Sequence, residues 1–369
     1  MRLRSHPIGL YLSLVLLASL LFPTASIGSE PWVSYEGQNG PGSGKHIVLI
    51  SGDEEYRSEE ALPQFAQILA RHHGFRCTVL FAIDPESGVI NPNILNNIPG
   101  LQALKSADLM IVFTRFRALP DAQMQLIDDY LKNGRPVFGI RTATHAFQFN
   151  AKHPWARYSN SYRGEDSAWT GGFGRLVLGE KWINHYGHHK HESTRGVVVP
   201  DARDHAIARG LENCDIWGPT DVYEVRLPLP GDATPIVLGR IIQRTGKFEA
   251  EDPFYGMRPD DGPALPGKKN NPMMPIAWTK TYQIPGGQRG RAFTSTLGAG
   301  TDLISEGARR LWTNAVYWTL GMEHLIPDTG TAVDLVGTYK PTGYGNHPNT
   351  YWLKQNVKPS DLAWDTTRP

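Results

Sequence analysis

Residues 135–149 read RPVFGIRTATHAFQF, and this stretch decides the fold class. Val137, Phe138 and Ile140 form a short continuous apolar run, which is typical of a strand buried on both faces of a sheet. Polar residues follow where the strand ends, and open α/β sheets bind their ligands at the carboxyl ends of their strands. The stretch therefore predicts a central buried strand that leads into a candidate site.

Similar apolar runs occur earlier in the chain, and helical patterns lie between them. The runs cover 46–51, 77–83 and 109–113, the helical patterns surround Pro63 and Met124, and Gly74 and Gly134 end those helices. Alternation of strands and helices predicts a doubly wound, mostly parallel α/β sheet with right-handed crossovers and a flavodoxin-like strand order. We expect a single domain with long loops.

Composition limits the classes of function. The chain has 369 residues, 40% of them hydrophobic, and 37 basic residues nearly balance 36 acidic ones. A net charge of +1 gives no electrostatic footprint for nucleic acid or an acidic membrane surface. A small-molecule ligand is therefore favoured. Cys77 and Cys214 are the two cysteines, and a single bridge between them remains an open alternative.

The N-terminus carries an export signature. Two arginines precede an apolar run from Ile8 to Phe22, and small residues follow it up to Gly28. We expect a signal peptide at 1–28, cleaved near Gly28, and a periplasmic or extracellular mature chain with no membrane span. The remaining divisions are a leader at 29–44, the α/β domain at 45–325 and a C-terminal wrapping tail at 326–369.

Charged and polar residues follow three of the predicted strands. They are Glu54 and Glu55 after the first, Arg115 after the third, and Arg141, Thr142 and His145 after the central strand. Because parallel strands end at one edge of a sheet, these side chains should face a common crevice. An arginine fork with short hydroxyls suits vicinal oxygens of a substrate, and His145 suits acid–base catalysis. The alternative is a buried Arg141 paired with Glu54 or Glu55.

A histidine-rich segment, NHYGHHKHEST, spans 184–194. His185, His188 and His191 have the spacing His-x2-His-x2-His, and neutral imidazoles are good ligands for Zn²⁺ or another divalent metal. A solvated histidine-rich loop without metal is the alternative. Without metal, His188 is a candidate general base, because an unperturbed imidazole titrates near neutrality.

Three further predictions concern Asp221 and Tyr223, Trp169, and the last helix. Asp221 and Tyr223 alternate along a short strand and point to one face, where a carboxylate and a phenol would suit a sugar; satisfying buried backbone is the alternative. Trp169 is a candidate for stacking on a pyranose ring. A helix is expected from Leu303 to Leu320, with Asp302 as its cap.

Several pieces of the chain, taken in order, resemble the ThuA-like (trehalose utilisation) family of the class I glutamine amidotransferase-like superfamily. They are GDEEYRSEE, FGIRTATHAF, DHAIARGL, TDVYEV, PIAWTKTY and AFTSTLGAG, within about residues 45–325. True amidotransferases carry a cysteine nucleophile where this chain has Arg141, so glutamine hydrolysis is disfavoured. The chain also has Gly298-Ala299 where commoner ThuA-like sequences carry Gly-His.

The resemblance implies a role in carbohydrate catabolism. We expect an exported enzyme, a hydrolase or lyase, that cleaves a sugar derivative such as a 3-keto-glycoside, with His145, His188 and Asp221 as catalytic residues. The expected substrate-binding residues are Glu54, Glu55, Arg115, Arg141, Thr142, Tyr223 and Trp169. The alternative is a non-catalytic carbohydrate-binding or cell-envelope module that uses the same crevice.

Overall fold

The computed structural model describes residues 30–212 and 215–364. The predicted signal peptide and Cys214 lie outside the described residues, so a bridge between Cys77 and Cys214 stays a prediction; Cys77 is buried and forms no disulfide with a described residue. The strands of the main sheet are β1 (Trp32–Tyr35), β2 (His46–Gly52), β3 (Arg76–Phe81), β4 (Leu109–Thr114), β5 (Val137–Ile140), β7 (Glu192–Val198), β8 (Trp217–Gly218), β10 (Thr234–Gln243), β11 (Met274–Tyr282) and β12 (Gly290–Ser295). A small second sheet pairs β6 (Asn184–His185) with β9 (Tyr223–Glu224).

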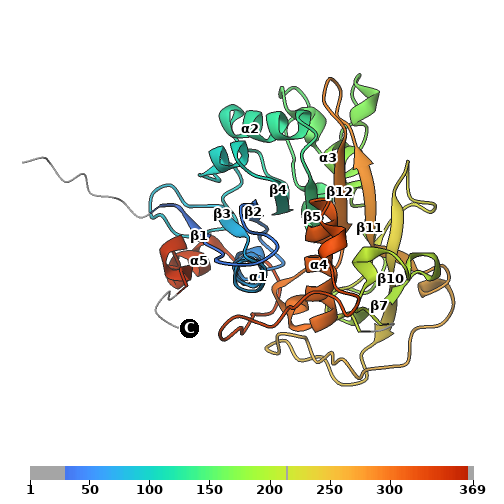
Figure 1. Cartoon of the computed structure of the whole chain (residues 1–369). Coiled ribbons are helices and arrows are strands. Elements are labelled where there is room, and N and C mark those ends of the chain that lie inside the picture. The colour runs from blue at the N-terminus through green and yellow to red at the C-terminus, as the bar shows by residue number, and fades with distance from the viewer. Residues whose placement is uncertain (1–29, 213–214, 365–369) are drawn as a thin grey trace, which may run out of the picture.

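The main sheet is mixed, with the order β1-β3-β2-β4-β5-β12-β11-β10-β7-β8 (Figure 1). Its centre, from β3 to β12, is parallel, as the alternating pattern predicts. The strands from β11 to β8 are added antiparallel, and β1 is antiparallel to β3 at the other edge. The α/β class and the single large sheet are confirmed, whereas the second half of the sheet is not parallel.

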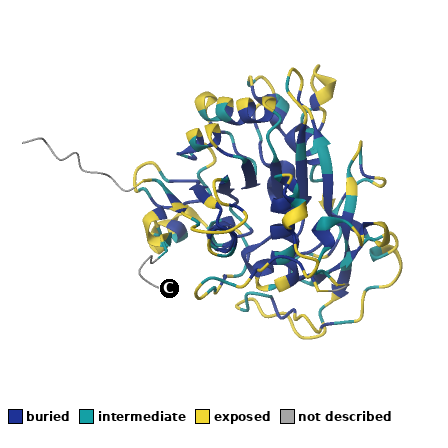
Figure 2. Cartoon of the chain, in the orientation of Figure 1, coloured by how far each residue is buried: buried dark blue, intermediate teal, exposed yellow. Residues whose placement is uncertain are grey.

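Helices cover both faces of the parallel region (Figure 1). The helices are α1 (Ser58–His73), α2 (Asp121–Lys132), α3 (Gly172–Leu178), α4 (Glu306–Thr319) and α5 (Asn349–Gln355). Phe65 of α1 and Trp312 of α4 pack on Phe138 of β5. On the opposite face α3 approaches β5 so closely that a Cβ at Gly139 would clash with Leu178. The sheet and the inner helix faces are therefore the buried part of the molecule (Figure 2).

Three boundaries differ from those predicted. The leader contributes β1, because residues 32–35 complete the edge beside β3. Helix α1 begins at Ser58, one turn before Pro63. Helix α4 begins at Glu306, where the Ser305 hydroxyl accepts from the Ala308 amide at 3.3 Å. Asp302 is not that cap, because its carboxylate accepts instead from the Thr220 hydroxyl at 2.7 Å.

The C-terminal tail wraps around α1 and returns to the edge of the sheet. Arg57, at the start of α1, donates to Thr342 Oγ1 at 3.1 Å and to the Gly345 carbonyl at 2.9 Å. The Tyr35 hydroxyl of β1 donates to the Leu362 carbonyl. Within the described ranges no helix combines the length and apolar character needed to cross a bilayer.

Candidate functional site

The ends of β2, β4 and β5 meet at one edge of the sheet, as the sequence predicts. Glu54 after β2 pairs with Arg115 and with Arg117, the latter at 2.7 Å, and both arginines follow β4. The Thr142 hydroxyl, after β5, donates to the Asp53 carboxylate. Thr142 is therefore tied to the chain itself, and its side chain is fully buried.

Arg141 forms the buried base of this region. It begins the short 3-10 turn Arg141–His145 in a left-handed conformation, with φ of 46°. Its guanidinium donates to the Asp221 carbonyl at 2.7 Å, to Asp221 Oδ1 at 2.9 Å and to the Thr296 carbonyl at 2.8 Å. The alternative of a buried Arg141 is found, but its ion-pair partner is Asp221 and not Glu54 or Glu55, and Asp221 replaces the solvation that the buried guanidinium loses.

Two tyrosine rings hold Arg141 from its sides. The guanidinium carbon lies 3.8 Å from the centre of the Tyr223 ring and 4.4 Å from that of Tyr56. Tyr223 is 2% exposed and Arg141 is 1% exposed. Both therefore position the site from beneath in this structure, and neither reaches the surface where a substrate would lie.

Asp221 joins two histidines that do reach the surface. Its Oδ2 lies 2.7 Å from Nδ1 of His185, and its Oδ1 lies 3.2 Å from Nδ1 of His189. The side chains of His185 and His189 are 36% and 26% exposed, whereas that of Asp221 is 0% exposed. A buried carboxylate thus orients two accessible imidazoles, an arrangement suited to acid–base chemistry or metal binding.

Charges around Asp221 favour the ionised form of its carboxyl group. Burial opposes ionisation of Asp221, but the Arg141 charge and the two histidine hydrogen bonds outweigh it and hold the pKa below its usual range. Glu55 behaves similarly: burial opposes ionisation, and His189 and Arg115 lower the pKa. Asp221 therefore stays an acceptor, so the two imidazoles must present Nδ1–H to it.

His189 lies between two carboxylates. Its Nε2 is 3.3 Å from Glu55 Oε1, while its Nδ1 faces Asp221. Burial lowers the pKa of this imidazole, but hydrogen bonds to Asp221 and Glu55 outweigh burial and raise it. A ring with acceptors on both nitrogens is an imidazolium. In contrast, His185 Nε2 makes no hydrogen bond within the described part of the chain, which leaves it available to a substrate.

Local pairing explains how the two histidines meet Asp221. His185 of β6 pairs with Tyr223 of β9, and the Gly187 amide donates to the Val222 carbonyl at 3.0 Å. A Cβ at Gly187 would lie 2.9 Å from the Cβ of Asp221, so only glycine lets the two segments approach. The histidine segment therefore lies directly against Asp221 and Val222, the two residues that precede β9.

The expected metal set needs correction. His188 and His191 stack on each other with ring centres 4.2 Å apart, and His188 is exposed. Among the described residues, the group whose donor atoms lie within 4.8 Å of one another is His185, His189 and Asp221. His189 thus takes the place of His188 and His191, because its Nδ1 lies 3.2 Å from Asp221 Oδ1.

Two other candidates are buried. His145 is 4% exposed, with its ring 5.4 Å from that of Trp182 and 6.3 Å from that of Tyr223. Burial and the charges of Arg115 and Arg141 hold its pKa well below the usual range, so the imidazole is neutral. Trp169 is 2% exposed and packs on Tyr158 at 4.4 Å, which leaves no ring face for a sugar.

Sequence reasoning missed three contributors. Tyr56 sits in the recognised charged loop, and His189 sits in the recognised histidine run, but spacing alone does not single them out. Tyr344 comes from the tail, where no sequence signal marks it. Its ring centre lies 5.3 Å from that of Tyr56 and 5.2 Å from that of His189, and the Gly345 amide donates to the Glu55 carbonyl at 2.7 Å.

Comparisons with known proteins give structural neighbours only: no family model and no curated protein matches the chain. A solved structure from Bacteroides uniformis, provisionally described as ThuA-like, covers 77% of this chain and 95% of its own, with 15% identity and a TM-score of 0.42. One from Parabacteroides merdae, described in the same way, covers 83% and 98%, with 14% identity and a TM-score of 0.43. The chain is similar to ThuA-like proteins.

A third neighbour is a Salmonella typhimurium protein described as cytoplasmic, with 11% identity, a TM-score of 0.39 and coverage of 74% of this chain and 98% of its own. At such identities and TM-scores, similarity to ThuA-like proteins assigns no role to any residue. The site described above is therefore argued from its own geometry.

Proposed function

We propose that the chain is a ThuA-like enzyme of carbohydrate catabolism that cleaves a sugar derivative of the 3-keto-glycoside kind. The observation that carries the proposal is the His185–Asp221–His189 array, in which a buried carboxylate orients two accessible imidazoles. The sequence resemblance supplies the substrate class. Glu55 and Arg115 border the array and are the candidate contacts for the sugar, whereas the Tyr344 ring is buried and packs on His189.

The two imidazoles suit complementary roles. His185, with Nδ1–H held by Asp221, offers Nε2 as a base for the acidic proton on the carbon between the ketone and the anomeric carbon. As that proton leaves, the electron pair of the C–H bond forms a double bond to the anomeric carbon, and the bond from the anomeric carbon to the departing oxygen breaks. His189, held as an imidazolium, donates its Nε2 proton to the departing oxygen, which replaces Glu55 as the acceptor of that proton. Water then adds to the unsaturated ring, so that the net reaction is hydrolysis.

The same three residues also fit a divalent metal. Two imidazole nitrogens and one carboxylate oxygen are the ligand number and type of a catalytic zinc site, and their atoms lie within 4.8 Å of one another. A zinc ion held there would supply a water acidified toward neutral pH. Asp221 would then be a ligand, while Arg141 would orient its carboxylate through the 2.9 Å contact.

Turnover of a defined panel tests the proposal. Purified protein, with and without added Zn²⁺, is incubated with α- and β-glucosides and their 3-keto derivatives, and products are resolved by chromatography. Release of the aglycone from a 3-keto-glycoside, lost in His185→Ala and kept in the control His188→Ala, is the expected result. Saturable sugar binding without product in any condition would instead indicate the carbohydrate-binding module.

Export is a separate part of the proposal. Residues 1–28 have the charged start, apolar centre and small-residue end of a signal peptide. Mass spectrometry of protein isolated from its native compartment should find a chain that begins near Ser29. An intact Met1 on a membrane-bound form would contradict cleavage.

A further inference from the structure

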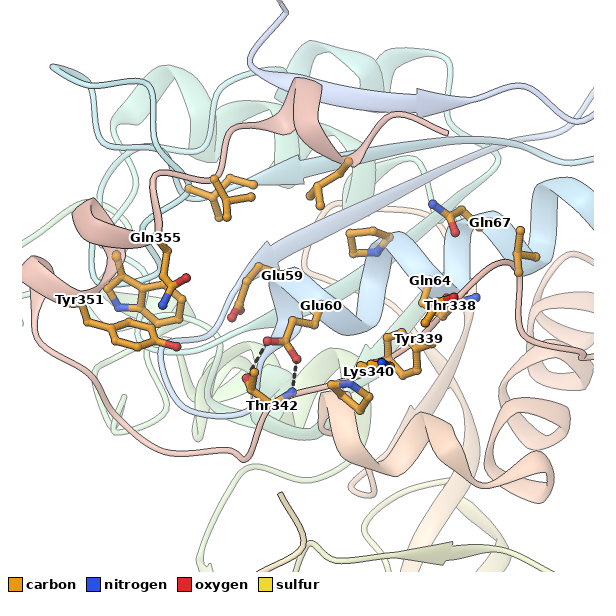
Figure 3. Close-up of a pocket in the computed structure, with 17 residues that line it drawn as sticks. Glu59, Glu60, Gln64, Gln67, Thr338, Tyr339, Lys340, Thr342, Tyr351 and Gln355 are labelled. Atoms are coloured by element: carbon orange, nitrogen blue, oxygen red, sulfur yellow. Dashed lines mark hydrogen bonds between the residues drawn. The ribbon is translucent and has the colours of Figure 1, made fainter. Parts of the chain in front are cut away.

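A groove of about 410 Å³ separates α1 from the C-terminal tail. Its walls are the first turns of α1, residues 336–342 and the helix α5 (Figure 3). Figure 3 shows Glu59 projecting from α1 toward Tyr351 and Gln355 of α5. The catalytic candidates His185, His189 and Asp221 do not line this groove, so it is a separate feature of the molecule.

Glu59 and Trp352, which line the groove, and Arg57 next to Glu59 carry polar groups without partners. Both carboxylate oxygens of Glu59, the indole Nε1 of Trp352 and Nη1 of Arg57 make no hydrogen bond within the described residues. Their side chains are well shielded, with Glu59 10% and Arg57 1% exposed, and Trp352 is 5% exposed. Glu59 Oε1 and Arg57 Nη1 are 3.9 Å apart, which is too far for a hydrogen bond.

Glu60, the next carboxylate along α1, does find partners in the tail, so the lack of partners is specific to Glu59. Glu60 accepts from the Thr342 amide at 2.8 Å and from the Thr342 hydroxyl at 2.6 Å. Burial, reinforced by Glu60, raises the pKa of Glu59 to about 8, although the Arg57 charge opposes the shift. Native proteins rarely leave buried polar groups without a hydrogen bond. We therefore expect a ligand that forms hydrogen bonds with both Glu59 and Trp352.

The unpaired groups select the chemistry of that ligand. With its pKa raised to about 8, Glu59 is protonated at neutral pH and presents one donor O–H and one acceptor oxygen, whereas the Trp352 N–H needs an acceptor. A hydroxyl both donates and accepts, while an ammonium only donates and would also face the Arg57 charge. The rings of Tyr351 and Trp352 add apolar wall area of the kind that packs against a sugar ring.

We propose that this groove is a second ligand site, which binds a neutral polyhydroxylated molecule of mono- or disaccharide size through Glu59 and Trp352. A volume of about 410 Å³ lies in the usual range of small-ligand pockets. Binding requires the side chains of Glu59 and Trp352 to open slightly toward the groove, because their polar atoms are shielded in the empty structure.

Calorimetric titration of the full chain tests the site. The background is the double variant His185→Ala/His189→Ala, which removes the proposed catalytic array and makes the result independent of turnover. D-glucose, maltose and trehalose are the neutral probes, and choline chloride is the cationic probe. We expect saturable binding of at least one sugar and none of choline.

Substitutions then locate the binding. Glu59→Met and Trp352→Phe keep much of the shape but remove the carboxyl group and the N–H, and should each raise Kd by about tenfold or more. Leu353→Ala is the matched control on α5, since Leu353 is 44% exposed and outside the groove. Thermal unfolding establishes that each variant is folded, and Trp352→Phe decides the matter if Glu59→Met does not fold.

Three results would overturn the proposal. One is the absence of sugar binding in the double variant, which means that ordered water alone satisfies Glu59 and Trp352. Another is sugar binding that both substitutions leave unchanged, which would place it elsewhere. The third is preferential binding of choline, which would make the groove a cation site.

Discussion

Arg141 Nη2 and Asp221 Oδ1 lie 2.9 Å apart, and both side chains are fully shielded from solvent. Asp221 in turn accepts from His185 and His189, so the arginine acts on the accessible imidazoles through one carboxylate. The ion pair therefore fixes the geometry of the proposed catalytic array from below. It also means that Arg141, the first residue after β5, serves to position other groups.

Arg141→Met should destabilise the fold, because it leaves the Asp221 carboxylate buried and unpaired. Breaking one side of a buried pair costs roughly 3–5 kcal/mol, measurable by urea unfolding. Arg163→Met is the control, since Arg163 is exposed, and it should change stability by less than about 0.5 kcal/mol. Unchanged stability with lost sugar affinity would show that Arg141 contacts the ligand directly.

Asp221→Asn should lower kcat more than it raises KM. An amide offers one acceptor oxygen where the carboxylate offers two, so only one of the Nδ1–H groups of His185 and His189 keeps its partner. General acid–base catalysis contributes about 10²- to 10⁴-fold, and we expect a loss of that order in kcat. Asp201→Asn, at an exposed position, is the control. A variant with normal kcat would rule out the array as the catalytic centre.

Elemental analysis after equilibration with Zn²⁺ should find one ion per chain in wild type. His189→Ala should lose it, because His189 is within the ligand group, whereas His188→Ala should keep it, because His188 stacks on His191. If His188→Ala lost the metal and His189→Ala kept it, the ligand set predicted from spacing would be right and that of the structure wrong. A zinc-free wild type would leave acid–base chemistry as the function of the array.

Asp302→Asn should change how stability depends on pH. Burial raises the pKa of Asp302 from 3.8 to about 6, against the opposing hydrogen bond from Thr220. The folded state therefore holds the proton more tightly than the unfolded state, and this group's contribution to stability falls as pH rises from about 4 to 6. The Asp302→Asn variant has no carboxyl group at this position, so its free energy of unfolding lacks this decrease. The difference in unfolding free energy between variant and wild type should shift by about 2–3 kcal/mol across the window.

The control for Asp302 is the same measurement on Asp201→Asn, whose exposed carboxyl should give no such shift. Parallel stability curves for wild type and Asp302→Asn between pH 4 and 6 would contradict the raised pKa.

Tyr344→Ala should weaken both stability and activity. The ring packs on Tyr56 and on His189, and truncation of a buried aromatic side chain costs about 3–5 kcal/mol. Tyr344→Phe keeps the ring and loses only the hydrogen bond to the Pro219 carbonyl, at 3.0 Å, which contributes about 1 kcal/mol. Chemical denaturation and kcat are measured together. Normal kcat in Tyr344→Ala, once folding is verified, would remove the tail from the active site.

The sequence predicted the parallel centre of the sheet because its signals are local. Apolar runs such as 46–51 and 137–140 are long enough for buried strands, and each ends in polar residues. Parallel strands have their carboxyl ends at one edge of the sheet, so the pattern predicted a common crevice for Glu54, Arg115 and Thr142 but not which side chains pair there. The antiparallel half was not predicted, since the residues of a strand do not specify the direction in which its partner runs.

By itself, then, the sequence determined the fold class, the edge of the sheet that carries the polar residues and the importance of the histidine segment. Only the tertiary structure decided that His189 faces Asp221, that Asp221 pairs with Arg141, and that Tyr344 closes the array. These are contacts between segments far apart in the chain, such as β6 with β9 and the tail with α1. The side chain that fills each position depends on the packing of the whole domain, which residue spacing does not encode.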